Sequence, residues 1–506
     1  MPVIGTHQKP GKEEETVRRS GQAAAGGVPA VFLAAVLAAF SAAGGQQRIA
    51  ENSCSASPGA EEQTGGLSEN LEFIQPDTLL YGRPGADFGK GSTDVFETDF
   101  SQAKVNAPLP ETFSWAARGK KPTVRNQGSL GTCWALTAAE AVESALLPQT
   151  RLVLSADHIS LQNGFDIAQD EGGDYSMIMS YMADFKGPVT EEEDPYGDGS
   201  SPQGLKAAVH VGEMRLLEGM SADRIRHMIY RFGAVQTSLS MDRTRTDQGR
   251  SFYYNEKTCS YYDPVTEPLN HDVLVLGWDD TYSKKHFRVQ PAHDGAWICQ
   301  NSWGAGFGRD GIFYVSYEDA NLFRKGGIAY TDVRTAEDAD HVLETDSLGW
   351  QARQGYGCES AWFAGVFETD SPQMLEAAGL YAVGPATTWR MVLVENFQGP
   401  DSLSEAADGK NGILLGCGWI ENPGFYTLRL RWPLSLPAGK RFAVVVFVDT
   451  PGTGRPVAVE TRKDRYTDTV SLDGRESYIS RDGTSWERTQ TAYRTNACLK
   501  LYTSDT

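Results

Sequence analysis

The chain has 506 residues, and its 66 acidic against 46 basic side chains give a formal net charge of −20 at pH 7. This balance argues against a nucleic-acid binder, which needs a basic surface. With 40% hydrophobic and 22% charged residues, the composition is that of a globular protein and excludes a disordered or collagen-like chain. The length predicts two or three domains.

An alanine-rich stretch near the N-terminus predicts a secretory signal peptide over residues 1–45. Residues 28–43 are apolar, follow a pair of arginines and end in small side chains that suit signal peptidase. As a helix, the stretch would be shorter than the roughly 30 Å hydrocarbon core of a membrane. We therefore expect a secreted, periplasmic or cell-surface protein whose membrane contact is confined to this segment. An uncleaved anchor is the alternative.

Three regions of different composition follow the signal. Residues 46–107 are rich in glycine, proline, serine and acidic side chains, which predicts a linker or pro-segment. Residues 108–335 mix a helical pattern at 134–147 with apolar strand patterns at 273–278 and 311–317, which predicts an α+β domain. In residues 336–506, short β-rich runs between turn signals predict an antiparallel sandwich; the runs are 389–395, 425–430, 442–448, 457–461 and 497–502.

The most informative segment is a glycine-punctuated loop that leads into the predicted helix and places Cys133 at its start. A helix N-terminus favours negative charge, so a Cys133 thiolate would be stabilised there. A thiolate nucleophile also needs a base and a residue that orients the base. His271 lies at the mouth of an apolar strand, and Asn301 lies in a short polar island, where its side-chain oxygen would accept the second imidazole N–H.

The chain holds seven cysteines, an odd number, so at least one of them cannot form a disulfide within the chain. A role as a thiolate nucleophile would explain why Cys133 is the unpaired cysteine. The other six are scattered along the chain, and both disulfides and buried free thiols remain open for Cys54, Cys259, Cys299, Cys358, Cys417 and Cys498.

Together with Gln127, these residues occur in the order Gln, Cys, His, Asn, and the chain resembles the papain-like (C1) cysteine peptidases. The histidine lies 138 and the asparagine 168 residues after Cys133. The second separation exceeds the family's roughly 130–150, which an insertion at residues 283–294 would explain. The resemblance implies a helical lobe and a β-barrel-like lobe, with Cys133 as nucleophile and His271 as base and acid.

The resemblance also implies roles for further residues. Asn301 would orient His271, and Trp303 would shield their hydrogen bond from water. Gln127 and the backbone N–H of Cys133 would form the oxyanion hole. Gly172 and Gly173 resemble the glycine wall that pairs with an extended substrate, because glycine permits close approach of another backbone.

Two departures from the family pattern point to one of its branches. Leu130 stands where many members carry a second cysteine, and residues 46–107 show no recognisable charged inhibitory helix. Both features resemble a bacterial and archaeal branch with a C-terminal lectin-like domain. Motifs around Trp350, Trp362 and Trp486 resemble that domain; these tryptophans would either stack on sugar rings or fill the sandwich core.

The sequence thus predicts a secreted endopeptidase that hydrolyses peptides or unfolded proteins through a thioacyl intermediate on Cys133. No cofactor is expected, and no metal site, because His286 and His293 lack metal-ligand spacing and no paired cysteine motif exists. One alternative is a surface protein that binds glycan or cell wall through the C-terminal domain and keeps an idle peptidase scaffold. Another is a transpeptidase or a maturation protease for one partner.

Overall fold

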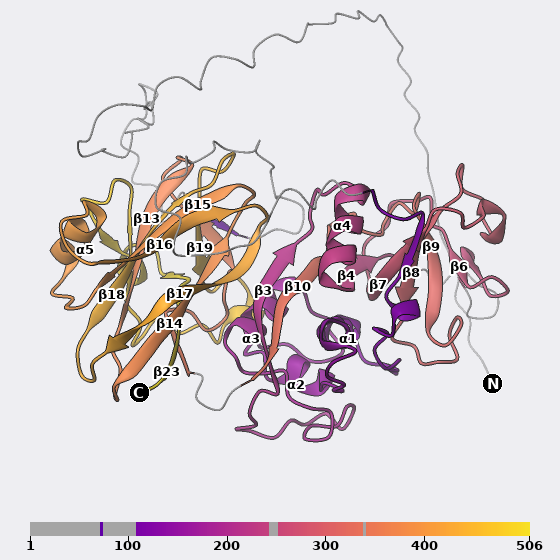
Figure 1. The fold of residues 1–506 in the computed structure, drawn as a ribbon, viewed down its shortest axis with the longest axis horizontal. Helices are drawn as coiled ribbons and strands as arrows, with labels where there is room; N and C mark the ends of the chain where they lie inside the picture. The colour runs from indigo at the N-terminus through magenta and orange to yellow at the C-terminus, as the bar shows by residue number, and fades with distance from the viewer. Residues whose placement is uncertain (1–70, 74–107, 242–250, 337–340) are drawn as a thin grey trace, which may run out of the picture. The chain divides into compact units, whose positions relative to one another are not determined.

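The computed structural model describes residues 71–73, 108–241, 251–336 and 341–506, all within one compact unit, Ala56–Thr506 (Figure 1). The predicted signal peptide, residues 1–45, lies outside the described residues. So does most of the predicted linker or pro-segment, of which only β1 (Leu71–Phe73) is described. This strand pairs antiparallel with β12 (Ala352–Gln354) in the C-terminal part of the chain.

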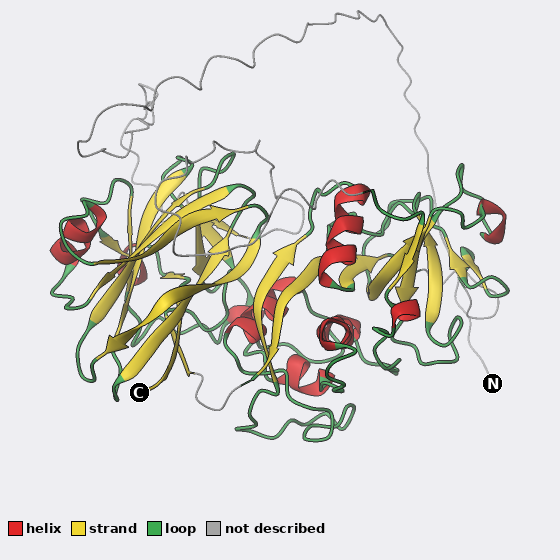
Figure 2. Cartoon of the chain, in the orientation of Figure 1, coloured by secondary structure: helices red, strands yellow, loops and turns green. Residues whose placement is uncertain are grey.

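The N-terminal part, residues 108–336, combines helices with a largely antiparallel sheet (Figure 2). The helices are α1 (Cys133–Leu146), α2 (Ala156–Leu161), α3 (Tyr175–Ala183) and α4 (Ala222–Phe232). The strands are β2 (Thr112–Ser114), β3 (Val209–Leu216), β4 (Val235–Leu239), β5 (Tyr254–Asn255), β6 (Ser260–Tyr261), β7 (His271–Asp279), β8 (Ala296–Gln300), β9 (Ile312–Ser316) and β10 (Ile328–Thr335).

The central elements of this part are α1 and β7. The sequence of α1 is dominated by alanine, leucine and glutamate, which have high helix propensity, and nearly every side chain of the helix is buried. β7 is an almost continuous apolar run and is buried on both faces except at Asp279. It pairs with β4 on one side and with β8 on the other. The predicted helix and strands are therefore present, with ends shifted by one or two residues.

The C-terminal part, residues 341–506, is a β-sandwich with two short helices, α5 (Pro400–Ala407) and α6 (Thr489–Ala492). Side chains of β14 and β17 pack in one core with those of β13, β15 and β18 from a six-stranded sheet. The strands are β11 (His341–Glu344), β12, β13 (Ser360–Phe367), β14 (Gln373–Ala382), β15 (Thr387–Val394), β16 (Ile413–Ile420), β17 (Gly424–Leu436), β18 (Phe442–Asp449), β19 (Val457–Glu460), β20 (Ser477–Ser480), β21 (Glu487–Arg488), β22 (Asn496–Ala497) and β23 (Lys500–Asp505).

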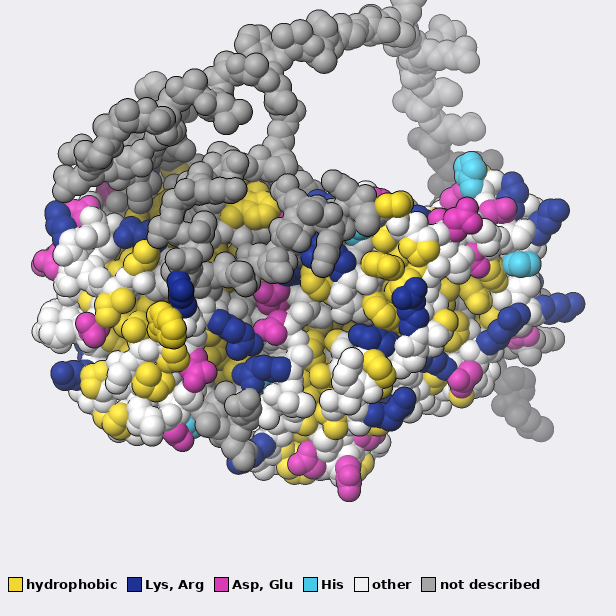
Figure 3. Space-filling view, viewed as in Figure 1, with side chains coloured by type: hydrophobic (Ala, Val, Ile, Leu, Met, Phe, Trp, Pro, Cys, Tyr) yellow, Lys and Arg dark blue, Asp and Glu magenta, His cyan; other side chains and the backbone are white. Residues whose placement is uncertain are grey.

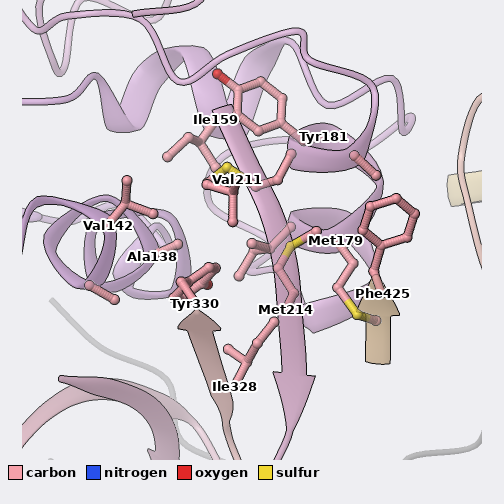
Figure 4. Close-up of a cluster of buried hydrophobic side chains, with 14 of the residues drawn as sticks. Ala138, Val142, Ile159, Met179, Tyr181, Val211, Met214, Ile328, Tyr330 and Phe425 are labelled. Carbon is pink, nitrogen blue, oxygen red and sulfur yellow. The ribbon is translucent and has the colours of Figure 1, made fainter. Parts of the chain in front are cut away.

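One sheet runs through both parts of the chain. β17 pairs antiparallel with β3, with Phe425 opposite Met214. Both side chains join the hydrophobic cluster that also holds α1 residues such as Ala138 and Val142 (Figure 4). The two parts therefore share main-chain hydrogen bonds and a core, and are not connected only by a linker.

A buried lysine forms a second link between the two parts. Lys500 of β23 is fully buried, and its Nζ forms ion pairs with Asp184, at the end of α3, and with Glu344 and Asp346 at 3.0 Å each. Burial alone would lower the pKa of Lys500, but these carboxylates outweigh that effect and raise the pKa well above its ordinary value. A charged lysine is thus retained in the interior by carboxylates from both parts.

In the C-terminal part, the structure divides one predicted strand and decides between the two alternatives that the sequence left open for its tryptophans. The single strand predicted at 497–502 is divided between β22 and β23. Trp350 and Trp362 are only 2% and 7% exposed and belong to the core, so they cannot stack on a sugar; Trp486 is partly buried, and its indole N–H donates to Gly483 O at 3.1 Å. The tryptophan that is exposed, at 73%, is Trp432 in β17, which the sequence did not single out.

Most of the described cysteines form no disulfide: Cys133, Cys259, Cys299, Cys417 and Cys498. Cys358 is disulfide-bonded, and Cys54 lies outside the described residues. Within the described ranges, no helix combines the length and apolar character needed to cross a membrane. The face of the molecule in Figure 3 presents acidic, basic and hydrophobic side chains side by side.

We predict that Lys500→Met destabilises the protein by about 3–5 kcal/mol, because the variant leaves buried carboxylates without their cation. The free energy of unfolding is measured by urea denaturation followed through tryptophan fluorescence. Lys410→Met is the matched control, since Lys410 pairs with Asp408 on the surface and its loss should have little effect. Equal stability of the two variants would contradict the role of Lys500.

Candidate active site

Cys133 is the first residue of α1, so its thiol lies at the positive end of the helix macrodipole. Thr132 precedes it but does not cap the helix with its side chain. Its hydroxyl instead forms a hydrogen bond with the Tyr196 hydroxyl, which also donates to the backbone carbonyl of Gln127 at 3.0 Å. Tyr196 therefore braces the loop on which Cys133 and Gln127 lie.

His271 begins β7 and is buried beside Asn301, which follows β8. The distance between His271 Nε2 and Asn301 Oδ1 is 2.7 Å. The backbone N–H of Ser302 donates to the same oxygen at 2.8 Å, which fixes the orientation of the Asn301 amide. An oxygen that only accepts requires a proton on Nε2, so this contact selects the tautomer of neutral His271 and leaves Nδ1 for proton transfer.

The start of β7 is held against the first turn of α1. The side-chain N–H₂ of Gln236 donates to the backbone carbonyl of Trp134 at 3.0 Å and to the Asp272 carboxylate at 2.6 Å. The hydroxyl of Thr137 lies 3.4 Å from the backbone carbonyl of Asp272. Trp134 and Asp272 are the residues that follow Cys133 and His271 in the chain. These contacts therefore bring α1 and β7 together next to the two site residues.

Gln127 and Trp303 complete the same group of side chains. Gln127 Oε1 accepts hydrogen bonds from the Ser302 hydroxyl at 2.9 Å and from the Trp303 indole at 3.1 Å. Because its oxygen is occupied, the N–H₂ group of Gln127 points toward the Cys133 loop, where it donates to Leu130 O at 2.8 Å. The Trp303 ring lies 4.7 Å from the His271 ring, centroid to centroid.

Gly172 and Gly173 lie in the loop before α3, beside the start of α1. A Cβ atom added to Gly173 would come within 2.2 Å of the Trp134 ring, so only glycine fits there. Gly172 has a φ of 94°, in the region that favours glycine. The structure therefore places the glycine pair next to the residue that follows Cys133.

Two carboxylates on α1, those of Glu140 and Glu143, are buried, and neither was expected from the sequence to be buried. Glu143 pairs with Arg125 at 2.5 Å and accepts the backbone N–H of Leu154 at 2.9 Å. Burial raises the pKa of Glu143 to about 7 and that of Glu140 to about 8, although Arg125 opposes both shifts. Acidic residues on the apolar face of a predicted helix were the signal for this feature.

The remaining histidines named from the sequence lie elsewhere. His286 and His293 belong to the loop between β7 and β8, where His293 pairs with Glu318 at 2.6 Å. In the part of the chain that the structure describes, no three His, Cys, Asp or Glu side chains gather as a metal site would require.

Comparison with known protein families assigns both parts of the chain. Residues 109–333 match the family described as papain family cysteine protease, and residues 342–503 match the family described as lectin like domain. The chain thus contains a papain-family cysteine protease domain followed by a lectin-like domain. The resemblance and the α+β fold class predicted from the sequence are thereby confirmed.

Two curated relatives match a little under half of this chain. Cathepsin S of Bos taurus is 28% identical over 228 residues, which are 43% of this chain and 62% of that protein. Procathepsin L of Rattus norvegicus is 28% identical over 232 residues, 44% of this chain and 64% of that protein. The chain therefore spans less than two thirds of the length of these relatives.

Solved structures match both domains. The crystal structure of the cysteine protease and lectin-like domains of Cwp84, a surface layer associated protein of Clostridium difficile, has a TM-score of 0.68 at 21% identity. The match covers 79% of this chain and 90% of that chain. A second structure, of Cwp84 C116A after propeptide cleavage, has a TM-score of 0.67 at 22% identity and covers 78% of this chain and 99% of that chain. The two-domain fold is thus shared.

The raised pKa of Glu140 in the papain-like domain predicts a pH dependence of stability. Between pH 5 and 7 the native state keeps a proton on Glu140 that the unfolded state has lost, since the ordinary pKa is near 4.5. The free energy of unfolding should therefore fall with rising pH by roughly 1.4 kcal/mol per pH unit from this group. Glu140→Gln should remove that slope in urea unfolding from pH 5 to 7; an unchanged slope would contradict the shift.

Proposed function

We propose that the protein is a secreted cysteine endopeptidase that hydrolyses peptide bonds through a thioacyl intermediate on Cys133. The observation that carries the proposal is the 2.7 Å hydrogen bond between His271 and Asn301, on an element held against the first turn of the Cys133 helix. The match of residues 109–333 to the papain family supports the same conclusion. Peptides and unfolded proteins are the proposed substrates.

In the proposed reaction, Cys133 and His271 form a thiolate and an imidazolium. The thiolate attacks the carbonyl carbon, and the carbonyl oxygen becomes an oxyanion bound by the Gln127 N–H₂ and the backbone N–H of Cys133. His271 then donates its Nδ1 proton to the leaving amine as the C–N bond breaks. Water attacks the thioester, His271 takes its proton, and the acid product leaves as the thiolate is restored.

The surrounding residues assist this chemistry without reacting. Asn301 keeps the His271 ring in one orientation while its charge changes, and Trp303 covers their hydrogen bond against water. Gly172 and Gly173 offer main-chain groups to an extended substrate at close range. Secretion is proposed from the predicted signal over residues 1–45, and the surface-layer association of Cwp84 supports it.

The alternative, a glycan-binding protein with an idle peptidase scaffold, has less support. Two of the three tryptophans proposed to stack on sugars are buried in the core. Gln127, Cys133, His271 and Asn301 are all present, and the contacts that orient Gln127, His271 and Asn301 are formed. A ligand of the lectin-like domain, carbohydrate or cell-surface, would bind in addition to the peptidase function.

We predict that an epoxysuccinyl thiol inhibitor labels the full-length protein once, at Cys133, already at pH 6, because a thiolate at the helix start needs no alkaline activation. Mass spectrometry detects the label. Cys133→Ala should abolish labelling, whereas Cys417→Ala should not, although Cys417 is exposed and free. Labelling only after removal of residues 46–107 would make that segment an inhibitory pro-segment; absence of labelling in both forms would contradict the proposal.

A second prediction concerns the oxyanion hole. Gln127→Ala should lower kcat for peptide hydrolysis by about 10²–10³, because one donor to the oxyanion is lost. Alkylation of Cys133 by iodoacetamide forms no oxyanion, so its rate should change little. If hydrolysis kept the wild-type rate in this variant, Gln127 would have no such role; if alkylation fell equally, the loss would lie in the thiolate.

A further inference from the structure

A loop of the lectin-like domain contacts the loop that ends in the glycine pair of the papain-like domain. The first, residues 461–471, we call the lectin-domain loop; the second, residues 163–173, we call the glycine-wall loop. A backbone hydrogen bond, a hydroxyl hydrogen bond and an ion pair join the two loops. The Asp166 backbone N–H donates to Tyr466 O at 3.0 Å, the Thr469 hydroxyl donates to Gly164 O at 2.8 Å, and the Arg465 guanidinium pairs with the Glu171 carboxylate.

The lectin-domain loop is internally braced, so it can act as a fixed support. Its short helix, Arg465–Thr467, begins with a capping box between Asp464 and Thr467, in which the Thr467 hydroxyl accepts the Asp464 backbone N–H at 3.1 Å. The Asp464 side chain also accepts the backbone N–H of Tyr466. Val470 is fully buried, and its carbonyl accepts the Arg462 guanidinium at 2.8 Å. The side chains of Arg465 and Thr469 therefore contact the papain-like domain from a loop that is held by its own hydrogen bonds.

Glu171 connects this support to the glycine pair. Its backbone N–H donates to Ala168 O at 3.0 Å, and the Ala168 N–H donates to the Glu171 carboxylate at 3.2 Å, which closes a tight turn. The other carboxylate oxygen pairs with Arg465. Because Gly172 follows directly, a shift of Glu171 is transmitted to the glycine pair without any intervening flexible residue.

On its opposite side the glycine-wall loop packs against the Cys133 segment. The backbone N–H of Gly131 donates to Gln169 O at 2.9 Å, and a Cβ on Gly131 would lie 2.9 Å from the Gly172 N. The Trp134 ring leaves no room for a side chain at Gly173. The glycine-wall loop is thus held between the nucleophile segment of one domain and the lectin-domain loop of the other.

We infer that the lectin-domain loop, through Arg465 and Thr469, is a positioning element that holds Gly172 and Gly173 in place for an extended substrate. This inference rests on the proposed function, because it assigns Gly172 and Gly173 to substrate binding. If Gly172 and Gly173 are already ordered, they lose less conformational freedom when the substrate binds. The contacts of the lectin-domain loop therefore strengthen substrate binding. Arg465 and Thr469 touch no reacting atom, so the chemical step itself is unaffected.

The test compares the full-length protein with Arg465→Ala/Thr469→Val, using a fluorogenic tetrapeptide amide that the wild type hydrolyses. We expect KM to rise about threefold to tenfold and kcat to stay within about twofold, the pattern of lost binding shared by ground and transition states. A single-residue amide, too short to reach the glycine pair, should show wild-type kinetics. Asp468→Ala, in the same loop at an exposed position, is the matched control and should match the wild type.

A charge exchange tests the Arg465–Glu171 contact separately. Arg465→Glu alone should raise KM for the tetrapeptide amide, because it places two carboxylates together. Adding Glu171→Arg should reverse part of the rise in KM, because it re-forms the ion pair but removes the acceptor of the Ala168 N–H; a general loss of stability would give no recovery. The alkylation rate of Cys133 by iodoacetamide should stay constant throughout the series.

The outcomes separate this inference from the proposed function. Normal Cys133 alkylation and hydrolysis in the wild type, with an unchanged KM in both Arg465 variants, would overturn the inference alone. The same result follows if the Asp468→Ala control raises KM equally. A wild-type protein that neither alkylates at Cys133 nor hydrolyses any peptide would overturn the proposed function and this inference with it.

Discussion

The structure depends above all on the burial of β7 between its neighbouring strands and α1. A strand buried on both faces can be displaced only by breaking its ladders with β4 and β8 and by opening the core, so its position is well determined. The antiparallel pairing with β8 sets Asn301 beside His271, and Gln236 ties the strand to the start of α1. The proposed catalytic group is thus a consequence of one buried strand.

Burial also determines the protonation states of several charged side chains. Glu140 and Glu143 on α1 lie in a region so poorly solvated that their carboxyl groups hold protons near neutral pH, and Arg125 offsets only part of that cost. Lys500, in turn, remains charged because three carboxylates surround it. At Lys500, the buried charge is thus balanced by partners of opposite sign that are buried with it.

The papain-like and lectin-like domains are joined by contacts of several kinds. The β3–β17 ladder, the Lys500 ion pairs and the contacts of residues 461–471 join them at three separate places. Attachment at several places is consistent with the inferred role of residues 461–471 in holding Gly172 and Gly173, since a single hinge would let these glycines move.

The sequence by itself determined the features that depend on local chemistry and periodicity. Cys133 at a helix start, His271 at the mouth of an apolar strand, and the β-rich runs after residue 336 could all be read from neighbouring residues. Only the tertiary structure decided the pairing of β3 with β17, the burial of Lys500, and the meeting of Arg465 with Glu171. These features join residues about 200 to 300 positions apart, and no local pattern encodes which distant surfaces will bury one another.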